Sequence, residues 1–446
     1  MDTPICDFVK KYAESSAVRL HMPGHKGKGF LGTESMDITE INGADVLYSP
    51  CGIIAKSQHN ASTLFGTART VYSTEGSSLC IRAMLRLALE GKKGDSKKPW
   101  ILAARNVHKA FLSACALLDV DVEWIYPDES DGVLCCRVTA QRVENAINVR
   151  GEKPIAVYLT SPDYLGNTCD VAEIAAVCQK YGVLLLVDNA HGAYLRFLGE
   201  DRHPILLGAD MCCDSAHKTL PVLTGGAYLH ISKCAPQQIV DSATAAMELF
   251  ASTSPSYLIM QSLDRANAYL DGDYRERLSR LVAKVDEIKE RLCEKGMRVV
   301  GDEPIKLTLA PKSYGYTGEE LAEYLLSRDM VCEFADRDFC VMMLTPETDA
   351  SDVDRLESSL LALEKKAAVI EPYPTLRAAR RAMSIREAML SPSKEVDVED
   401  AEGMILGQPS VACPPAVPVV MCGEIIDSDA IKCFKYYNIK RVRVVK

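Results

Sequence analysis

The sequence predicts an α/β protein with a doubly wound, mainly parallel sheet, followed by a smaller α+β domain. Between about residues 60 and 245, short aliphatic runs alternate with helical patterns. The runs are continuous, as expected for strands buried on both faces of a parallel sheet. This βα alternation is typical of doubly wound domains. The expected strands are residues 100–104, 155–160, 183–188 and 226–231, and two expected helices are 77–90 and 171–181.

The rest of the chain suggests a division into four parts. A charged amphipathic helix is expected over 272–295, followed by the strand KLTLA, a helix near 318–328, the pair MVCEFA and CVMMLT, and a helix at 351–366. A Pro-rich patch covers residues 413–420. The expected parts are an N-terminal arm (1–45), a large α/β domain (46–270), a small α+β domain (271–370) and a C-terminal domain (371–446).

The composition is that of a folded, soluble protein. The chain has 446 residues, of which 48% are hydrophobic and 25% charged, and no apolar run is long enough to span a bilayer. The net charge of -10 argues against non-specific binding to nucleic acid and suits small cationic substrates. The first twenty residues lack the apolar region of a secretory signal, so we expect a cytoplasmic location.

The seventeen cysteines favour a reducing compartment. Cys135-Cys136 and Cys212-Cys213 are adjacent pairs, and no C-x-x-C occurs. Adjacent cysteines do not suit an ordinary disulfide, and zinc sites usually need paired ligands at short gaps. We therefore expect free thiols and no metal site.

Two segments place candidate catalytic side chains beside strands. Lys218 lies in the polar, Gly-flanked loop of DSAHKTLPVLTGGAYLHI, where a lysine with a lowered pKa could form an imine with an aldehyde cofactor. Asp188 ends the strand of VLLLVDNAHGA, at the edge where α/β proteins bind ligands, and could keep a pyridinium nitrogen protonated. The alternatives are an exposed loop lysine and an aspartate that caps a turn or binds magnesium.

Two further segments suggest contacts for a flat, phosphorylated cofactor. Gly76, Ser77 and Ser78 open an apolar helix, where backbone N–H groups and two hydroxyls would face an anion. His108 follows a candidate strand and could stack on an aromatic ring. Plain N-capping and a structural histidine are the alternatives. The order of phosphate loop, stacking residue, strand-end aspartate and lysine matches the fold-type-I family of pyridoxal-phosphate enzymes.

Eight segments narrow this match: HMPGHKG (21–27), DITEI (37–41), RNVHKA (105–110), SPDYLGNTCDV (161–171), DNAHGA (188–193), SAHKTLP (215–221), TSPSYLIMQSLD (253–264) and CPPAVPVVMCGE (413–424). Together they resemble the bacterial ornithine/lysine/arginine decarboxylase family, in its shorter form without an N-terminal wing domain. The similarity extends over most of the chain, and SAHKTLP with HMPGHKG is a specific combination.

The resemblance implies pyridoxal 5'-phosphate as cofactor and assigns residues to it. Lys218 would bind it as a Schiff base, Asp188 would pair with its ring nitrogen, and His108 would stack on the ring. His191 would lie near the ring hydroxyl and the substrate carboxylate. The residues around the phosphate or its edge would be Gly76, Ser77, Ser78, Ser215 and His217.

The resemblance also implies an obligate homodimer with shared active sites. Thr253 and Ser254 would reach the phosphate of the neighbouring subunit. Three positions depart from the family pattern. Glu75 replaces an asparagine of the phosphate loop and could weaken cofactor affinity, Asn189 replaces a glutamate, and Asp163 occupies a position that is often threonine.

The implied activity is decarboxylation of a basic L-amino acid, with arginine favoured and lysine or ornithine as alternatives. The ring would absorb the electrons left behind by CO₂, and Lys218, His191 or His217 could protonate the α-carbon. Glu424 is the candidate partner of the substrate cation, with a surface glutamate as the alternative. Another fold-type-I reaction, such as transamination, and a catalytically silent homologue are the rival functions.

Overall fold

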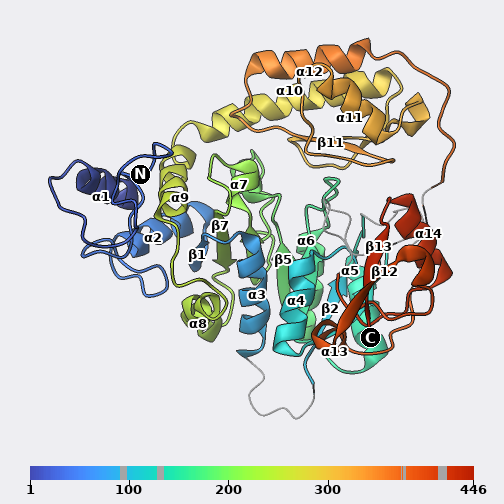
Figure 1. Ribbon diagram of the computed structural model, residues 1–446, viewed down its shortest axis with the longest axis horizontal. Helices are drawn as coiled ribbons and strands as arrows, with labels where there is room; N and C mark the ends of the chain where they lie inside the picture. The colour runs from blue at the N-terminus through green and yellow to red at the C-terminus, as the bar shows by residue number, and fades with distance from the viewer. Residues whose placement is uncertain (91–97, 128–134, 373, 375–377, 410–418) are drawn as a thin grey trace. The chain divides into compact units, whose positions relative to one another are not determined.

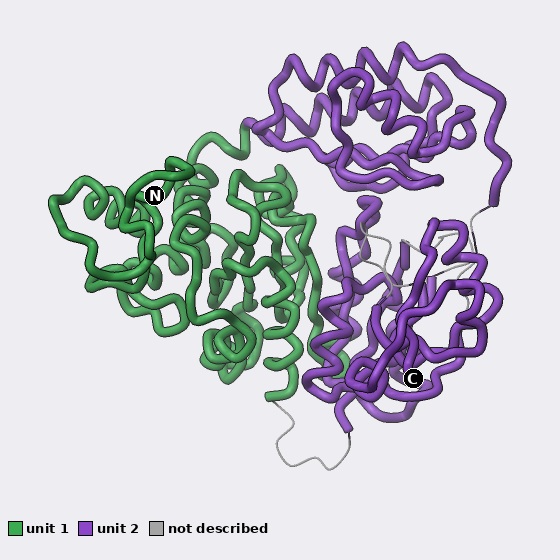
Figure 2. Tube along the Cα trace, viewed as in Figure 1, with its two compact units in different colours: residues 1–95, 178–276 green, residues 96–177, 277–446 purple. Residues whose placement is uncertain are grey.

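The computed structural model describes residues 1–90, 98–127, 135–372, 374, 378–409 and 419–446 (Figure 1). The chain divides into two compact units (Figure 2). Unit 1 consists of residues 1–95 and 178–276, and unit 2 of residues 96–177 and 277–446. The four-part division expected from the sequence stays a prediction. Most of the Pro-rich patch at 413–420 lies outside the described residues.

The largest sheet has seven strands in the order β1-β7-β6-β5-β4-β2-β3. The pairs β2/β3, β2/β4 and β5/β6 are parallel, which confirms the predicted mainly parallel sheet. The expected strands agree with the structure to within one residue. The bounds are β1 (Arg69–Ser73), β2 (Trp100–Ala104), β3 (Asp121–Ile125), β4 (Ala156–Thr160), β5 (Leu184–Asp188), β6 (Met211–Asp214) and β7 (Ala227–Ile231).

The direction of β7 differs from the expectation of a parallel strand. β7 is buried throughout, as predicted, but it pairs antiparallel with both β6 and β1. Residues 215–226 return the chain from β6 without a full crossover helix, so the next strand runs the opposite way. Continuous burial reports that a strand is covered on both faces, and it does not report the strand's direction.

The helices of unit 1 cover the strands that carry the candidate site. Helix α3 packs against β1, β5, β6 and β7 through its apolar face. The N-terminal arm is held by Asp264, which accepts the backbone N–H groups of Ile5 and Cys6 at 2.9 and 3.0 Å. The bounds are α1 (Pro4–Ala13), α2 (Ile53–Phe65), α3 (Ser77–Ala88), η2 (Ala193–Phe197), α7 (Ala216–Thr219), α8 (Gln237–Glu248) and α9 (Tyr257–Leu270).

Unit 2 contains a second sheet, which confirms the predicted α+β segment. Its four strands follow the antiparallel order β10-β11-β9-β8, and α11 packs against β10 and β11. Only the last two residues of MVCEFA form a strand. The bounds are β8 (Val299–Val300), β9 (Lys306–Leu309), η3 (Pro311–Tyr314), α11 (Gly318–Leu326), β10 (Phe334–Ala335), β11 (Cys340–Met343) and α12 (Ala350–Ala362).

Four more helices complete the central part of the chain: α4 (Lys109–Leu118), α5 (Ala140–Arg150), α6 (Val171–Tyr181) and α10 (Tyr274–Glu294). The C-terminal residues form α13 (Ile385–Leu390), β12 (Ser393–Asp397), η4 (Val398–Asp400), α14 (Ser428–Tyr436) and β13 (Arg441–Val445). β12 and β13 pair antiparallel over a core that includes Leu406, Ile426 and Phe434. Across the described residues, no helix is both long and apolar enough to cross a bilayer.

A buried ion pair joins the C-terminal residues to the segment after β2. The guanidinium of Arg105 donates to Glu424 Oε2 at 3.0 Å, and both side chains are at least 96% buried. The backbone N–H of Met421 donates to the same carboxylate oxygen at 2.7 Å. Because charges so deep in the fold need close partners, each side chain depends on the other.

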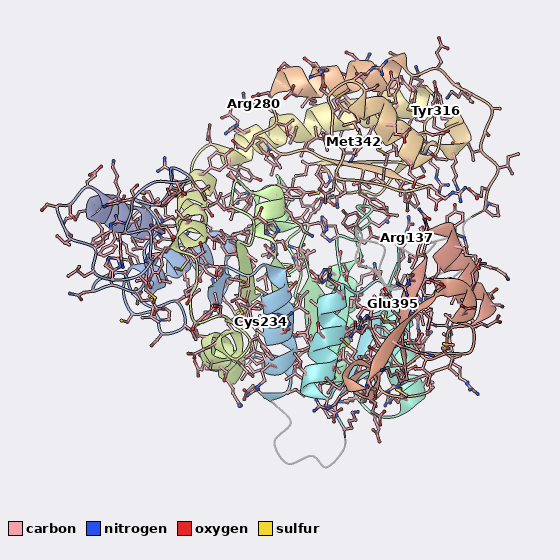
Figure 3. The ribbon with its side chains drawn as sticks, viewed as in Figure 1. Arg137, Cys234, Arg280, Tyr316, Met342 and Glu395 are labelled. Carbon is pink, nitrogen blue, oxygen red and sulfur yellow. The ribbon has the colours of Figure 1, made fainter. Side chains whose placement is uncertain are left out.

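The loop after β4 is built around the carboxylate of Asp163. Its Oδ1 accepts the backbone N–H groups of Leu165 and Asn167, each at 2.9 Å. The Asn167 amide, which also accepts from Arg137 (labelled in Figure 3), donates to Asp163 Oδ2. Burial raises the pKa of Asp163 to about 6, although the hydrogen bonds from Asn167 act in the opposite direction. The buried Asp163 carboxylate therefore holds the loop in its conformation through hydrogen bonds from the loop's own residues.

We expect Asp163→Asn to remove a pH dependence of stability. A carboxyl group with a pKa of about 6 when folded and 3.8 when unfolded stabilises the folded state fully below pH 3.8. That stability is lost as the pH rises through 6, by roughly 3 kcal/mol. Denaturation of both proteins at several pH values should show the wild type losing this amount relative to the variant. Parallel stability curves would contradict the prediction.

Candidate active site

A short turn between β6 and β7 presents Lys218. The lysine lies in α7, and its backbone N–H donates to the carbonyl of Ser215 at 2.9 Å. Its Nζ lies 3.0 Å from Nε2 of His191, which is buried in the loop after β5. The fold thus brings together two of the predicted catalytic residues, which are 27 positions apart in the chain.

The same turn is bonded to the predicted phosphate loop. The hydroxyl of Ser215 donates to that of Ser77 at 2.8 Å. Gly76 precedes α3 with φ +70°, a conformation that favours glycine, and a Cβ added there would meet nothing within 4 Å. No side chain caps this end of α3. An open helix N-terminus with the hydroxyls of Ser77 and Ser78 beside it fits a phosphate group.

Asp188 closes β5 and is buried. Its Oδ1 accepts the backbone N–H of Ala190 at 3.2 Å and lies 3.5 Å from the thiol of Cys213 on the neighbouring strand. A buried carboxylate gains most from a charged partner. Its position at the carboxyl end of a strand, in the same unit as Lys218, fits a partner for a pyridinium nitrogen.

His217 lies next to Lys218 and is half-buried. Its Nδ1 lies 3.0 Å from the carbonyl oxygen of Gly226, and its backbone N–H donates to the same oxygen. Burial lowers the pKa of His217; the contact with Gly226 opposes this change, and the charge of Lys218 adds to it. A neutral imidazole is therefore favoured at this position.

Glu75 holds a second loop beside Gly76. Its carboxylate accepts the backbone N–H of Ser252 at 2.7 Å, and the exposed Thr253 follows directly. The departure of Glu75 from the family pattern thus has a structural role within one chain. The predicted reach of Thr253 and Ser254 to a neighbouring subunit stays a prediction.

Two predicted site residues belong to unit 2. His108 follows β2 and caps α4, because its Nδ1 accepts the backbone N–H of Ala110 at 3.1 Å. This contact fixes the imidazole at the start of the helix, and stacking on a cofactor stays a prediction. Glu424 is paired with Arg105, so a substrate cation would have to share its carboxylate. Its substrate role also stays a prediction.

A buried network behind the site was missed by the sequence analysis. The carboxylate of Asp214, which ends β6, lies 3.0 Å from His203 Nε2 and 3.2 Å from His230 Nε2, and all three side chains are fully buried. Asn189 donates to its other oxygen at 2.7 Å. Burial alone would raise the pKa of Asp214, but the two histidines hold it well below its usual value.

The signal for this network is a polar residue inside an apolar run. His230 interrupts AYLHI and Asp214 ends MCCD, and polar side chains in such strands need internal partners. The nitrogen and oxygen atoms of His203, Asp214 and His230 lie within 4.8 Å of one another, so they could also act as metal ligands. The expected absence of a metal site therefore stays a prediction.

Comparison with known proteins agrees with this geometry. The family model for the major domain of Orn/Lys/Arg decarboxylases matches residues 3–306. An uncharacterised protein of Bacillus subtilis (strain 168), YaaO, is 28% identical, with 97% of this chain and 93% of that protein aligned. An arginine decarboxylase of the same strain is also 28% identical, over 96% and 92% of the two chains.

Solved structures show the same fold. The lysine decarboxylase of Francisella novicida aligns with a TM-score of 0.81 at 15% identity, over all of this chain and 81% of that one. The constitutive lysine decarboxylase of E. coli aligns with a TM-score of 0.77 at 17% identity, over 100% and 82%. The chain has the fold-type-I architecture, and it belongs to the Orn/Lys/Arg decarboxylases, a family of pyridoxal-phosphate-dependent amino-acid decarboxylases.

Proposed function

We propose that this protein releases CO₂ from arginine, or alternatively from lysine or ornithine, to leave the corresponding amine. The observation that carries the proposal is the 3.0 Å contact between Lys218 Nζ and His191 Nε2, on a turn bonded to the phosphate loop through Ser215 and Ser77. The preference for arginine is supported by aligned relatives named arginine decarboxylase in Bacillus and Halalkalibacterium.

The cofactor would be held by residues of the strand ends and of α3. Lys218 would bind its aldehyde carbon, and Gly76, Ser77 and Ser78 would bind its phosphate. Asp188 would hold a proton on the ring nitrogen, since a buried carboxylate favours a cation beside it. When bound, pyridoxal phosphate supplies the electron sink for the bond that breaks.

The histidines around Lys218 would handle protons. At 3.0 Å, one nitrogen of the Lys218–His191 contact donates and the other accepts, so the two residues share a proton. Either could deliver it to the α-carbon after CO₂ leaves. A neutral His217 whose Nδ1 donates to Gly226 has no proton on Nε2, so this nitrogen could accept a proton but not deliver one. The direct contact favours the Lys218–His191 pair.

A homodimer would cover the exposed N-terminal arm. Five large apolar side chains between residues 18 and 31 are at least 68% exposed: Val18, Leu20, Met22, Phe30 and Leu31. Exposed apolar side chains gathered in one segment are typical of an interaction surface. We propose that a second copy of the chain buries this arm. A cytoplasmic location would suit the described cysteines, all of which are free thiols.

We expect Lys218→Ala to abolish the visible absorbance of bound pyridoxal phosphate and to lower CO₂ release from arginine by on the order of 10⁴-fold. Lys233→Ala, at an exposed lysine, is the control and should retain both. The assay should include lysine and ornithine. A keto acid in place of CO₂ and amine would favour transamination, and bound cofactor without turnover would favour a silent homologue.

We expect Glu424→Gln to destabilise the protein by about 3 kcal/mol, because it leaves the buried Arg105 without a counter-charge. An unchanged KM for arginine would contradict the predicted role of Glu424 as the partner of the substrate cation. Glu395→Gln, at an exposed ion pair with Arg441 (Glu395 is labelled in Figure 3), should cost less than about 1 kcal/mol. A large rise in KM with unchanged stability would instead assign Glu424 to the substrate cation.

We expect the double variant Leu20→Ser, Phe30→Ser to shift the protein from dimer to monomer in light scattering. Both side chains are 88% exposed in the single chain, so the substitutions should not disturb the fold of one copy. Val149→Ser, at an equally exposed position on α5, should leave the dimer intact. A wild-type monomer, or a variant that stays dimeric, would contradict the role of the arm.

A further inference from the structure

Two thiols face each other in the small sheet of unit 2. Cys332 precedes β10, and Cys340 is the first residue of β11. The two strands pair with Ala335 opposite Cys340, and the backbone N–H of Glu333 donates to the carbonyl of Val341 at 3.0 Å. This hydrogen bond extends the contact between the two strands toward Cys332. The thiol of Cys340 then donates to Sγ of Cys332 across 3.4 Å.

The distance is short enough for a bond to form with little rearrangement. A disulfide has a sulfur–sulfur length of about 2.05 Å, so the two atoms would have to approach by roughly 1.4 Å. Cys332 lies outside the paired residues of β10. Rotation of its side chain and a small shift of residues 330–333 could supply this movement while the strand pairs are kept.

The two cysteines differ in access to solvent. Cys340 is fully buried, whereas Cys332 is half-buried. Cys332 lines a hollow of about 620 Å³ together with Val331, which is 86% exposed, and Met342 (labelled in Figure 3). It also lines a second hollow of about 350 Å³ beside α11. A small oxidant can therefore reach Cys332 before it reaches Cys340.

The contact also separates the chemical roles of the two thiols. The hydrogen bond from Cys340 lowers the pKa of Cys332, although burial opposes this change. The same hydrogen bond and burial raise the pKa of Cys340. Since the thiolate is the nucleophile, Cys332 is the residue that attacks and Cys340 keeps the proton.

We propose that Cys332 and Cys340 form a redox modification site at which hydrogen peroxide closes a reversible disulfide. The Cys332 thiolate attacks the peroxide oxygen, a sulfur–oxygen bond forms, the O–O bond breaks, and with one proton taken up a water leaves. Cys340 sulfur then attacks Cys332 sulfur, the sulfur–oxygen bond breaks, and the Cys340 proton leaves with the oxygen as a second water. Two electrons pass from the thiols to one hydrogen peroxide.

The test is peptide mapping of the full-length protein after treatment with hydrogen peroxide and alkylation of the remaining thiols. Trypsin cuts after Arg328, Arg337 and Arg355, so Cys332 and Cys340 fall on the separate peptides 329–337 and 338–355. We expect these two peptides to be joined, with the loss of two hydrogen atoms, and to separate after reduction with dithiothreitol. Joining should be at least tenfold faster than oxidation of the exposed Cys293.

Matched variants distinguish a specific site from general oxidation. Cys293→Ser should leave the joining of 329–337 to 338–355 unchanged. Cys340→Ser should leave Cys332 without a resolving thiol, so that fragmentation of peptide 329–337 shows oxygen atoms on Cys332 itself and not only on Met330. The proposal would be overturned if Cys332 and Cys340 are still alkylated after Cys293 has been fully oxidised. It would also be overturned if Cys332 is joined to a cysteine other than Cys340.

Discussion

The geometry of unit 1 depends on the buried carboxylate of Asp214. Its partners come from three other segments: Asn189 after β5, His203 before β6, and His230 within β7. An anion removed from water is stable only while such partners surround it. Separation of these segments would leave a charge unpaired in the core, so the ends of the three strands keep one relative position. Lys218 lies only four residues after Asp214. The position of the turn that carries Lys218 therefore depends on the position of this carboxylate.

The candidate site is assembled from contacts that only the folded sheet can make. Ser215 and Ser77 are 138 residues apart, yet their hydroxyls join the lysine turn to the start of α3. The contact of Lys218 with His191 similarly requires β5 and β6 to lie side by side. Each group is on or next to a regular element, which limits its motion. Rigid placement of this kind is what catalysis by proximity requires.

Local patterns were sufficient to place two of the candidate residues beside strands. Asp188 ends an apolar run, and Lys218 lies in a polar, Gly-flanked loop before another apolar run, because strand length and burial are encoded locally. The direction of β7 and the partners of Asp214 were not predictable in this way, since they depend on which strands become neighbours. The ion pair of Glu424 shows the same limit. The sequence does not reveal that the fold places Arg105 beside this carboxylate.

The partners that acidic residues find in the folded protein also change how the net charge should be interpreted. A charge of -10 suggests a surface that attracts cationic substrates. However, Asp163, Asp214 and Glu424 are buried and engaged by backbone amides, by histidines or by an arginine. Asp163, with its pKa raised to about 6, is also less ionised near neutral pH than its residue type implies. Charges held inside by internal partners organise loops and strand ends, and they contribute little to the field that a substrate meets. The formal charge therefore includes acidic residues that shape the fold as well as those on the surface presented to a basic amino acid.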